Sequence, residues 1–327
     1  MSKLNRLRSI KFLCLLFRFR DKMMSSLGLF ELKKNLKQNL FFARIKFEDW
    51  LKKKKINRKL RSLPNNFIGN DFRDGDIVVS ITSYGKRVHD ALPYMLYSLL
   101  IQTILPKKIV VYLDYDNWSL VNLPWQLKRL QEVGVDIRFC KDIRSYKKLI
   151  PALLNFPNNA ILTLDDDIYY NRNYMEWMTT AYNASDKRTV LGQWGCIPTK
   201  MDGNYIPYNQ WPDCKKGTKN DEKSFIGCCG ICYPPHIFDD EIFNEEVFMQ
   251  LCPIADDIWF WVMQERLGIE RQYIEPWGRG YHTSVNRIEE FDRTQTGTLM
   301  SQNLIAGKNN QQLFNVVEYY NIQTYGK

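Results

Sequence analysis

Short β-branched segments alternate with helical segments along the middle of this chain, and this alternation most constrains the fold. We predict buried strands at Ile77–Ile81, Ile109–Leu113, Val135–Cys140 and Ala160–Leu164. These strands begin 32, 26 and 25 residues apart, which is the length of a strand–helix–strand unit. Such units lay their strands parallel through right-handed crossovers. The expected fold is therefore α/β, with a mostly parallel sheet flanked by helices.

Helical periodicity fills the intervals between these strands and continues after them. The predicted helices are Ala91–Gln102, Trp125–Glu132, Ser145–Asn155 with a break at Pro151, Ala255–Arg266 and a terminal helix within Gln302–Gln323, and a further strand is predicted at Ile269–Ile274. Between Gly192 and Pro235 the pattern becomes irregular and rich in Trp, Gly, Pro and Tyr. An irregular segment of this kind, carried on a rigid sheet, is often where a substrate is held.

The charge of the first 61 residues differs from that of the remainder. Residues 1–61 hold 19 Lys and Arg against four Asp and Glu, a net charge of +15, whereas the remainder holds 27 against 32, a net charge of −5. We predict a basic amphipathic helical arm over residues 1–63 and a separate body over residues 64–327. A basic arm indicates an anionic partner, either a membrane surface or nucleic acid. A nucleic-acid-binding body should itself be basic, so the acidic body favours a membrane.

The apolar runs of the chain are short. The longest, Phe12–Phe17 and Ile258–Met263, have six residues each, whereas a membrane-spanning helix needs about 20. Phe12–Phe17 is also too short for the apolar core of a signal peptide, and no small cleavage-site residues follow it. We therefore expect a cytoplasmic protein whose eight cysteines are thiols. The motif Cys229-Gly-Ile-Cys232 lacks the second pair that a zinc site needs.

Three consecutive aspartates, Asp165–Asp167, follow the fourth predicted strand. Parallel sheets bind ligands beyond the carboxyl ends of their strands, and alternate residues point the same way, so Asp165 and Asp167 can face one ligand. Adjacent carboxylates repel each other unless a cation lies between them, and Mg²⁺ or Mn²⁺ would in turn hold phosphate oxygens. The alternative is a solvated acidic turn. The first strand is followed by neither G-x-G-x-x-G nor a Walker A loop, which argues against dinucleotide-binding enzymes and P-loop NTPases.

A second carboxylate pair, Asp256–Asp257, opens a predicted helix. Such residues often only cap a helix or meet its dipole, but two acidic groups in one fold could hold a metal and supply a base. Other candidates have equally simple structural roles: surface lysines, a hydrogen-bonding histidine, core aromatics and turn glycines. They could instead meet a diphosphate (Lys147, Lys148), bind a metal (His282) or contact a sugar or acceptor (Trp194, Trp211, Gly227, Gly230, Tyr233).

Several motifs of the body occur together and in one order. They are Val78-Val-Ser-Ile-Thr-Ser-Tyr84, the helix Ala91–Thr103, Ser145-Tyr-Lys-Lys-Leu-Ile-Pro-Ala152, Leu162-Thr-Leu-Asp-Asp-Asp-Ile168 and Ala255-Asp-Asp-Ile-Trp259. As a set they resemble the GT-A nucleotide-sugar glycosyltransferases, near glycosyltransferase family 2 and related bacterial surface-polysaccharide enzymes. The resemblance implies a GT-A type, Rossmann-like fold, with a nucleotide-binding half at about 76–185 and an acceptor and catalytic half at about 186–327.

The resemblance also implies roles for the acidic residues. Asp257 would be the general base of an inverting transfer, supported by Asp256, although the family usually has Glu-Asp here and the base is open between the two. The nucleotide and its metal, Mn²⁺ or Mg²⁺, would be held by the remaining groups. We assign nucleotide-sugar binding to Thr82, Tyr84, Asp114, Lys147, Lys148, Asp165 and Asp166, and metal binding to Asp167, Asp165 and His282.

The expected activity is a metal-dependent inverting transfer of one sugar from a nucleotide-sugar donor to a cell-surface glycan or lipid-linked acceptor. The Q-x-x-R-W motif of processive synthases is absent, which favours a single transfer. The enzyme is expected on the inner face of the cell membrane, held there by residues 1–61. The alternative is a metal-dependent nucleotidyltransferase that forms a nucleotide sugar and releases pyrophosphate. A more remote alternative is a nucleic-acid-binding protein that uses the basic arm.

Overall fold

The structure is a computed structural model that describes residues 29–65, 67, 75–214, 219, 223–275, 282–286 and 307–322, with no side-chain description for residues 29–35 and 282. It separates into two compact units, Met1–Lys52 and Lys53–Lys327. The described part of the first unit lies within helix α2 (Leu29–Ser62). The predicted helical arm is therefore one helix over the described residues, and the part of the prediction that falls on residues 1–28 lies outside them.

The last ten residues of α2 belong to the second unit. There Ile56 and Leu60 are buried in the hydrophobic core, and the Leu60 carbonyl accepts a hydrogen bond from Arg129 Nε at 3.2 Å. The end of the predicted arm is therefore part of the body rather than a linker to it.

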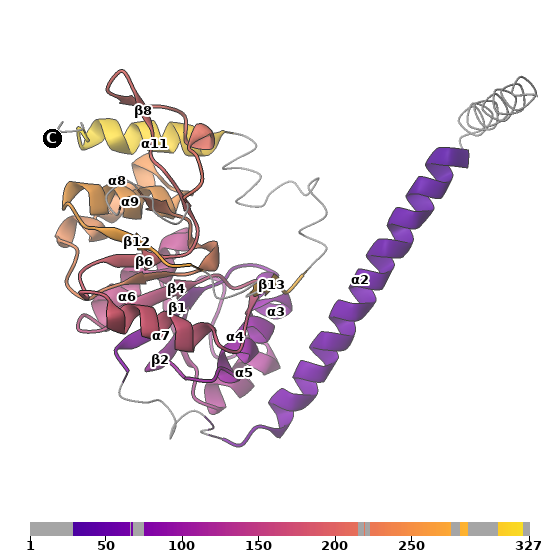
Figure 1. Ribbon diagram of the computed structural model, residues 1–327. Helices are drawn as coiled ribbons and strands as arrows, with labels where there is room; N and C mark the ends of the chain where they lie inside the picture. The colour runs from indigo at the N-terminus through magenta and orange to yellow at the C-terminus, as the bar shows by residue number, and fades with distance from the viewer. Residues whose placement is uncertain are drawn as a thin grey trace, which may run out of the picture. The chain divides into compact units, whose positions relative to one another are not determined.

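A seven-stranded sheet forms the centre of the second unit, in the order β12-β6-β11-β4-β1-β2-β3 (Figure 1). Its strands are β1 (Ile77–Thr82), β2 (Lys108–Asp114), β3 (Asp136–Cys140), β4 (Ala160–Leu164), β6 (Val190–Gly192), β11 (Ile231–Tyr233) and β12 (Arg271–Tyr273). Strands β3, β2, β1 and β4 are parallel neighbours, as predicted. The mostly parallel sheet with helices on both faces confirms the expected α/β, Rossmann-like architecture.

Strand β11 is the exception to the parallel arrangement. It pairs antiparallel with β4 on one side and with β6 on the other, while β12 pairs parallel with β6. Both β6 and β11 lie in or beside the segment that the sequence pattern marks as irregular. Each has three residues, which is too short for an alternation of apolar and polar residues to be visible.

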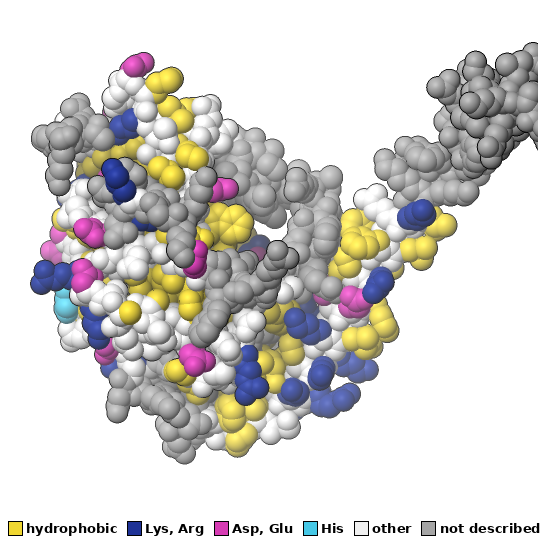
Figure 2. Space-filling model, viewed as in Figure 1, with side chains coloured by type: hydrophobic (Ala, Val, Ile, Leu, Met, Phe, Trp, Pro, Cys, Tyr) yellow, Lys and Arg dark blue, Asp and Glu magenta, His cyan; other side chains and the backbone are white. Residues whose placement is uncertain are grey.

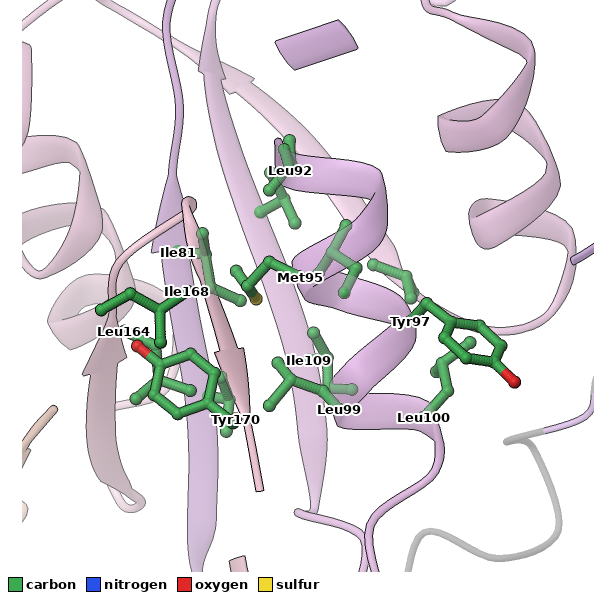
Figure 3. Packing of buried hydrophobic residues seen from close by; sticks show 14 of the residues in the cluster. Ile81, Leu92, Met95, Tyr97, Leu99, Leu100, Ile109, Leu164, Ile168 and Tyr170 are labelled. Carbon is green, nitrogen blue, oxygen red and sulfur yellow. The ribbon is translucent and has the colours of Figure 1, made fainter. Parts of the chain in front are cut away.

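One face of the sheet packs against α4 (Leu92–Leu100), α5 (Trp125–Glu132) and α7 (Tyr174–Ala184). Alternate strand residues supply this core, so Val79 and Ile81 belong to it whereas Val78 belongs to the other face. Figure 3 shows how α4 fills it: Leu92, Met95 and Leu99 lie among residues of three strands, Ile81, Ile109 and Leu164. Because both faces of the sheet are covered, the inner strands are apolar almost throughout, whereas the edge strands β3 and β12 carry polar residues.

The core on the other face contains the 3₁₀ helix η1 (Arg144–Lys148) and the helices α6 (Ile150–Asn155), α8 (Glu245–Leu251) and α9 (Asp256–Arg266), and α11 (Lys308–Tyr319) packs against α9 and α8. The predicted break at Pro151 is the junction between η1 and α6, with the proline in the first turn of α6, where its missing N–H costs nothing. The remaining elements are short. They are α3 (Arg87–Asp90), β5 (Ile168–Tyr170), β7 (Gly195–Cys196), β8 (Lys200–Met201), β9 (Asn204–Tyr205), η2 (Tyr208–Gln210), β10 (Ser224–Phe225), η3 (Gly227–Cys229), η4 (Asp240–Phe243) and β13 (His282–Ser284).

Candidate active site

Of the three aspartates that follow β4, Asp166 and Asp167 share one cation, whereas Asp165 faces another. Asp166 is buried and accepts hydrogen bonds from the Ser83 hydroxyl and from Arg87 Nη1, the latter at 3.1 Å. The same guanidinium nitrogen lies 2.9 Å from Asp167 Oδ2. Ser83 and Arg87 follow β1, the parallel neighbour of β4, so the carboxyl ends of both strands meet here. Burial raises the pKa of Asp166, against the opposing effects of Arg87 and Ser83.

Asp165 extends from the same turn toward a different set of partners. Its backbone N–H donates to the Tyr170 hydroxyl at 3.1 Å, which fixes the turn. Its carboxylate is about one third exposed, and Oδ1 lies 3.7 Å from Lys148 Nζ. Asp165 and Asp167 thus each lie beside a cation: Lys148, which was expected near the diphosphate, lies beside Asp165, and Arg87, which the sequence pattern did not indicate, lies beside Asp167.

The second acidic pair opens α9, and its carboxylates turn toward the same lysine. Lys148 Nζ lies 3.0 Å from Asp256 Oδ2 and 3.9 Å from Asp257 Oδ1. No side chain in the described residues caps the N-terminus of α9 by a hydrogen bond, so capping does not account for the pair. The fold therefore brings together the two acidic groups, which are about 90 residues apart in the chain.

Lys148 is the buried cation between these groups. Burial by itself lowers its pKa, but Asp256, Asp257 and Asp165 raise it, and the net pKa is well above the ordinary value. The ammonium therefore stays charged. It reaches this position because η1 follows β3 and packs under the carboxyl edge of the sheet, with its two lysines buried.

Gly227 brings backbone against the second acidic pair. Its N–H donates to Asp257 Oδ2 at 3.3 Å. A Cβ at this position would lie 2.6 Å from Lys148 Nζ and 3.2 Å from Asp257 Oδ1, so a side chain would displace the ammonium. The backbone at Gly227 thus approaches a carboxylate and a lysine of the chain itself, and the predicted contact of Gly227 with a sugar or acceptor stays a prediction.

Asp257 has the chemistry of a base that works near neutral pH. Burial is the largest effect and raises the pKa of Asp257 to about 7; Lys148 and the Gly227 N–H lower it, and Asp256 and Asp165 raise it. Its Oδ1 is buried and makes no hydrogen bond to any described residue. A carboxylate oxygen in this state can accept a proton from a bound hydroxyl group.

The predicted nucleotide residues lie at the ends of β1 and β2. Asp114 is buried, accepts hydrogen bonds from the backbone N–H and side-chain amide of Asn117 at 2.9 and 2.7 Å, and lies 4.0 Å from Lys147 Nζ. Lys147 is buried and paired with Asp142. The Thr82 hydroxyl donates to the Tyr112 carbonyl at 2.8 Å. Tyr84 is exposed beside the turn that carries Arg87.

The structure separates the aromatic candidates for sugar contact. Trp194 is 46% exposed after β6, at the same edge of the sheet as Asp165. Trp211 is buried, donates its indole N–H to the Ile206 carbonyl and packs edge-on against Trp261 at 5.3 Å. Tyr233 is buried within β11. Trp211 and Tyr233 are therefore core residues, because their large apolar rings complete the packing between the sheet and α9.

Gly230 is required for packing beside η3. Its φ of +94° lies in a region that side chains rarely adopt, and a Cβ would collide with the Tyr174 hydroxyl. That hydroxyl donates to the Cys229 carbonyl at 2.9 Å. Gly230 thus shapes the turn that carries Gly227 and does not itself contact the acidic groups.

The predicted metal ligands fit an ion only if a substrate completes its coordination. Asp165 and Asp167 offer two partly exposed carboxylates from one turn, which is the usual protein share of a Mg²⁺ site shared with phosphates. Among the described residues, no three His, Cys, Asp or Glu side chains are arranged to hold an ion by themselves. His282 lies in β13, which pairs with β5, but its side chain is outside the described part of the structure.

Sequence reasoning missed Ser83, Arg87 and Tyr170, which hold the aspartate turn in place. A signal for Arg87 was available, because it follows the first strand at the edge of the sheet where the aspartates were expected. Ser83 and Tyr170 carry no such signal, since a hydroxyl group acquires its role only from the partner that folding brings to it.

Comparison with known proteins gives similarity in structure only. No family model matches the sequence, and no curated protein matches it. The chain is similar to CMP:2-keto-3-deoxy-manno-octonic acid synthetase complexed with CTP, with 13% identity over 70% of this chain and 100% of that chain and a TM-score of 0.41. It is also similar to S. aureus TarS 1-349 in complex with UDP, with 13% identity, 61% and 58% coverage and a TM-score of 0.37. A third similar structure is a putative glucose-1-phosphate thymidylyltransferase from Bacillus anthracis, with 12% identity, 69% and 98% coverage and a TM-score of 0.38.

Proposed function

We propose that this chain is a metal-dependent inverting glycosyltransferase that moves one sugar from a nucleotide-sugar donor to a cell-surface glycan or lipid-linked acceptor. The observation that carries the proposal is the meeting of Asp165 and the Asp256–Asp257 pair around Lys148, at the ligand-binding edge of a mostly parallel sheet. One acidic group is suited to the donor phosphates and their metal, and the other contains a carboxylate suited to proton removal.

The reaction we propose is a single displacement. The acceptor hydroxyl oxygen bonds to the anomeric carbon of the donor while the bond from that carbon to the phosphate oxygen breaks, so the configuration inverts. Asp257 takes the hydroxyl proton, through the Oδ1 that makes no hydrogen bond to the described residues. The Gly227 N–H holds Oδ2 and so aims the carboxylate. The leaving group is the nucleoside diphosphate.

Asp167 and Asp165 would hold the Mn²⁺ or Mg²⁺, with Asp167 the more direct ligand. When bound, the ion supplies Lewis-acid stabilisation of the charge that develops on the diphosphate. Arg87 keeps Asp166 and Asp167 in a fixed orientation for this role. On the nucleotide side, Thr82 and Asp114 end the neighbouring strands β1 and β2, where the base and ribose are expected, and Lys147 of η1 lies 4.0 Å from Asp114.

The nucleotidyltransferase alternative differs in its attacking group. Where a sugar phosphate attacks, that group is already ionised at neutral pH and needs no base. A carboxylate such as Asp257, whose pKa burial raises to about 7, is suited to taking a proton from a neutral hydroxyl group, which favours the glycosyltransferase over the sugar-phosphate form of the alternative. The two reactions also release different products: a nucleoside mono- or diphosphate in the first, and pyrophosphate in the second.

A product assay tests the proposal directly. The full chain is incubated with a panel of nucleotide sugars and Mn²⁺, and separately with nucleoside triphosphates and sugar 1-phosphates. We expect release of a nucleoside diphosphate, slowly to water and faster with an acceptor, and its loss in chelator. Release of pyrophosphate in the second mixture, with no turnover in the first, would establish the nucleotidyltransferase instead.

We also propose that residues 1–61 attach the enzyme to the inner face of the cell membrane. Along the described part of α2, six large apolar side chains are exposed among basic residues, and Figure 2 shows the two kinds interspersed on this helix. They are Leu36, Leu40, Phe41, Phe47, Trp50 and Leu51. A basic helix of this kind can bury an apolar face in an anionic bilayer. No helix in the described part of the chain is long and apolar enough to cross a membrane.

A further inference from the structure

Lys148 has two possible roles: it could bind the donor diphosphate, or it could hold the surrounding carboxylates in position. As a basic residue after the third strand, it is expected to bind the donor diphosphate. In the structure its side chain is 9% exposed and its ammonium lies within 4 Å of carboxylates from two segments, the β4 turn and the start of α9. An ammonium has three protons to donate, and three carboxylates surround this one.

We propose that Lys148 is a positioning residue, which ties Asp165 on the donor side to Asp256 and Asp257 on the acceptor side, and that it does not bind the donor diphosphate. The proposal rests on the glycosyltransferase function above and deepens it. Lys148 is the one group that contacts both acidic pairs in the described residues, so it sets the distance between the metal-binding turn and the base.

The charge arrangement explains why such a residue is needed. Asp165, Asp256 and Asp257 would repel one another in a buried site, and the carboxylates would turn away toward water. A cation between them holds all three in place. The position of Asp257 is the most important for the reaction, because the direction of its carboxylate decides whether Oδ1 meets the acceptor hydroxyl.

Gly227 is a second and independent sign of this arrangement. Its missing side chain leaves the space into which the ammonium fits, since a Cβ would lie 2.6 Å from Lys148 Nζ. The same residue donates its N–H to Asp257. One glycine thus allows the lysine to approach and fixes the carboxylate that the lysine positions. A lysine meant to reach out to a diphosphate would not need its tip enclosed by backbone.

The test separates turnover from donor binding. Lys148→Met and Lys148→Arg are compared with wild type and with Lys187→Met, a matched control at an exposed lysine paired with Asp76. We measure kcat with saturating donor, and by calorimetry in chelator the Kd for the nucleoside diphosphate that the wild-type reaction releases, so that a metal held by Asp165 does not contribute to the Kd. A loss of kcat with unchanged ligand affinity marks a group that acts in the transition state and not in uniform binding.

For Lys148→Met we expect kcat to fall on the order of 10²-fold, the effect of a misplaced catalytic group, with Kd for the nucleoside diphosphate within about threefold of wild type. Lys148→Arg keeps the charge and should recover part of the lost kcat. A rise in Kd of about tenfold or more in Lys148→Met, absent in the control, would overturn the proposal and make Lys148 a diphosphate ligand.

Gly227→Ala gives a second route that keeps every charge, and it decides the question if Lys148→Met does not fold. The added methyl group displaces the ammonium, so kcat should fall while Kd for the nucleoside diphosphate stays unchanged. Normal kcat in Gly227→Ala would overturn the proposal. A wild-type chain that releases no nucleoside diphosphate from any donor would instead refute the glycosyltransferase function, which is a separate outcome.

Discussion

Asp257→Asn is the substitution that tests the proposed chemistry most directly. Asparagine keeps the shape of the side chain and an oxygen that can accept the Gly227 N–H, so the turn should stay in place. It cannot accept a proton from the acceptor hydroxyl. We therefore expect donor binding to survive while transfer is lost.

The expected size of the loss follows from the role of a general base. Such groups contribute about 10²–10⁴-fold to the rate, or about 3–5 kcal/mol of transition-state stabilisation. The pH dependence provides a second measure. With the pKa of Asp257 at about 7 instead of its ordinary 3.8, only about 1% of the carboxylate is ionised at pH 5. Since the base works in its ionised form, kcat/KM should fall about tenfold for each pH unit below 7.

The assay is the rate of nucleoside diphosphate release between pH 5 and 8, with donor and acceptor saturating in turn. The matched controls are Asp256→Asn, the neighbouring carboxylate, and Asp239→Asn, a surface carboxylate 3.3 Å from Arg266. A flat wild-type profile over this range would contradict the raised pKa as a catalytic feature. A crippled Asp256→Asn beside a nearly normal Asp257→Asn would show that the base is Asp256.

Three further outcomes are expected. Asp167→Ala should abolish turnover with an unchanged melting temperature, and wild-type turnover that persists in chelator would contradict the metal site. Gly230→Ala should destabilise the fold by at least about 1–3 kcal/mol in urea titrations, because its φ of +94° is strained for alanine and the Cβ meets Tyr174. Full-length protein should pellet with anionic vesicles at low salt and less at high salt, whereas a chain starting at Lys53 should stay in solution, and equal pelleting of both would remove the membrane role.

The truncation begins at Lys53 because the first unit of the structure ends at Lys52, whereas the predicted arm ended at residue 63. A cut near Asn65, just after the end of α2, would remove Ile56 and Leu60 from the core of the second unit. Local composition marks the change of charge at residue 61, but it does not reveal which helical residues are buried by contact with distant parts of the chain.

Much of the fold could be predicted from the sequence alone. The parallel strands β1, β2 and β4 are mainly apolar because both faces of the sheet are covered there, whereas the edge strand β3 also carries Asp136 and Arg138; the spacing between the four strands fits crossover units. The helix α9 and its two acidic residues were equally visible. So was the aspartate turn, because three charged residues directly after a buried strand must lie at the carboxyl edge of the sheet.

The tertiary structure decided the rest, since it depends on contacts between residues far apart in the chain. Strand β11 lies antiparallel between β4 and β6, and its pairing partners are about 70 and 40 residues away in the chain. A strand of three residues is too short for its sequence pattern to predict this pairing. The same holds for Trp211, whose burial no local pattern marks. Lys148 is a plain surface candidate in the sequence, and only the fold, by closing carboxylates from two segments and a glycine around it, turns it into the buried cation at the centre of the site.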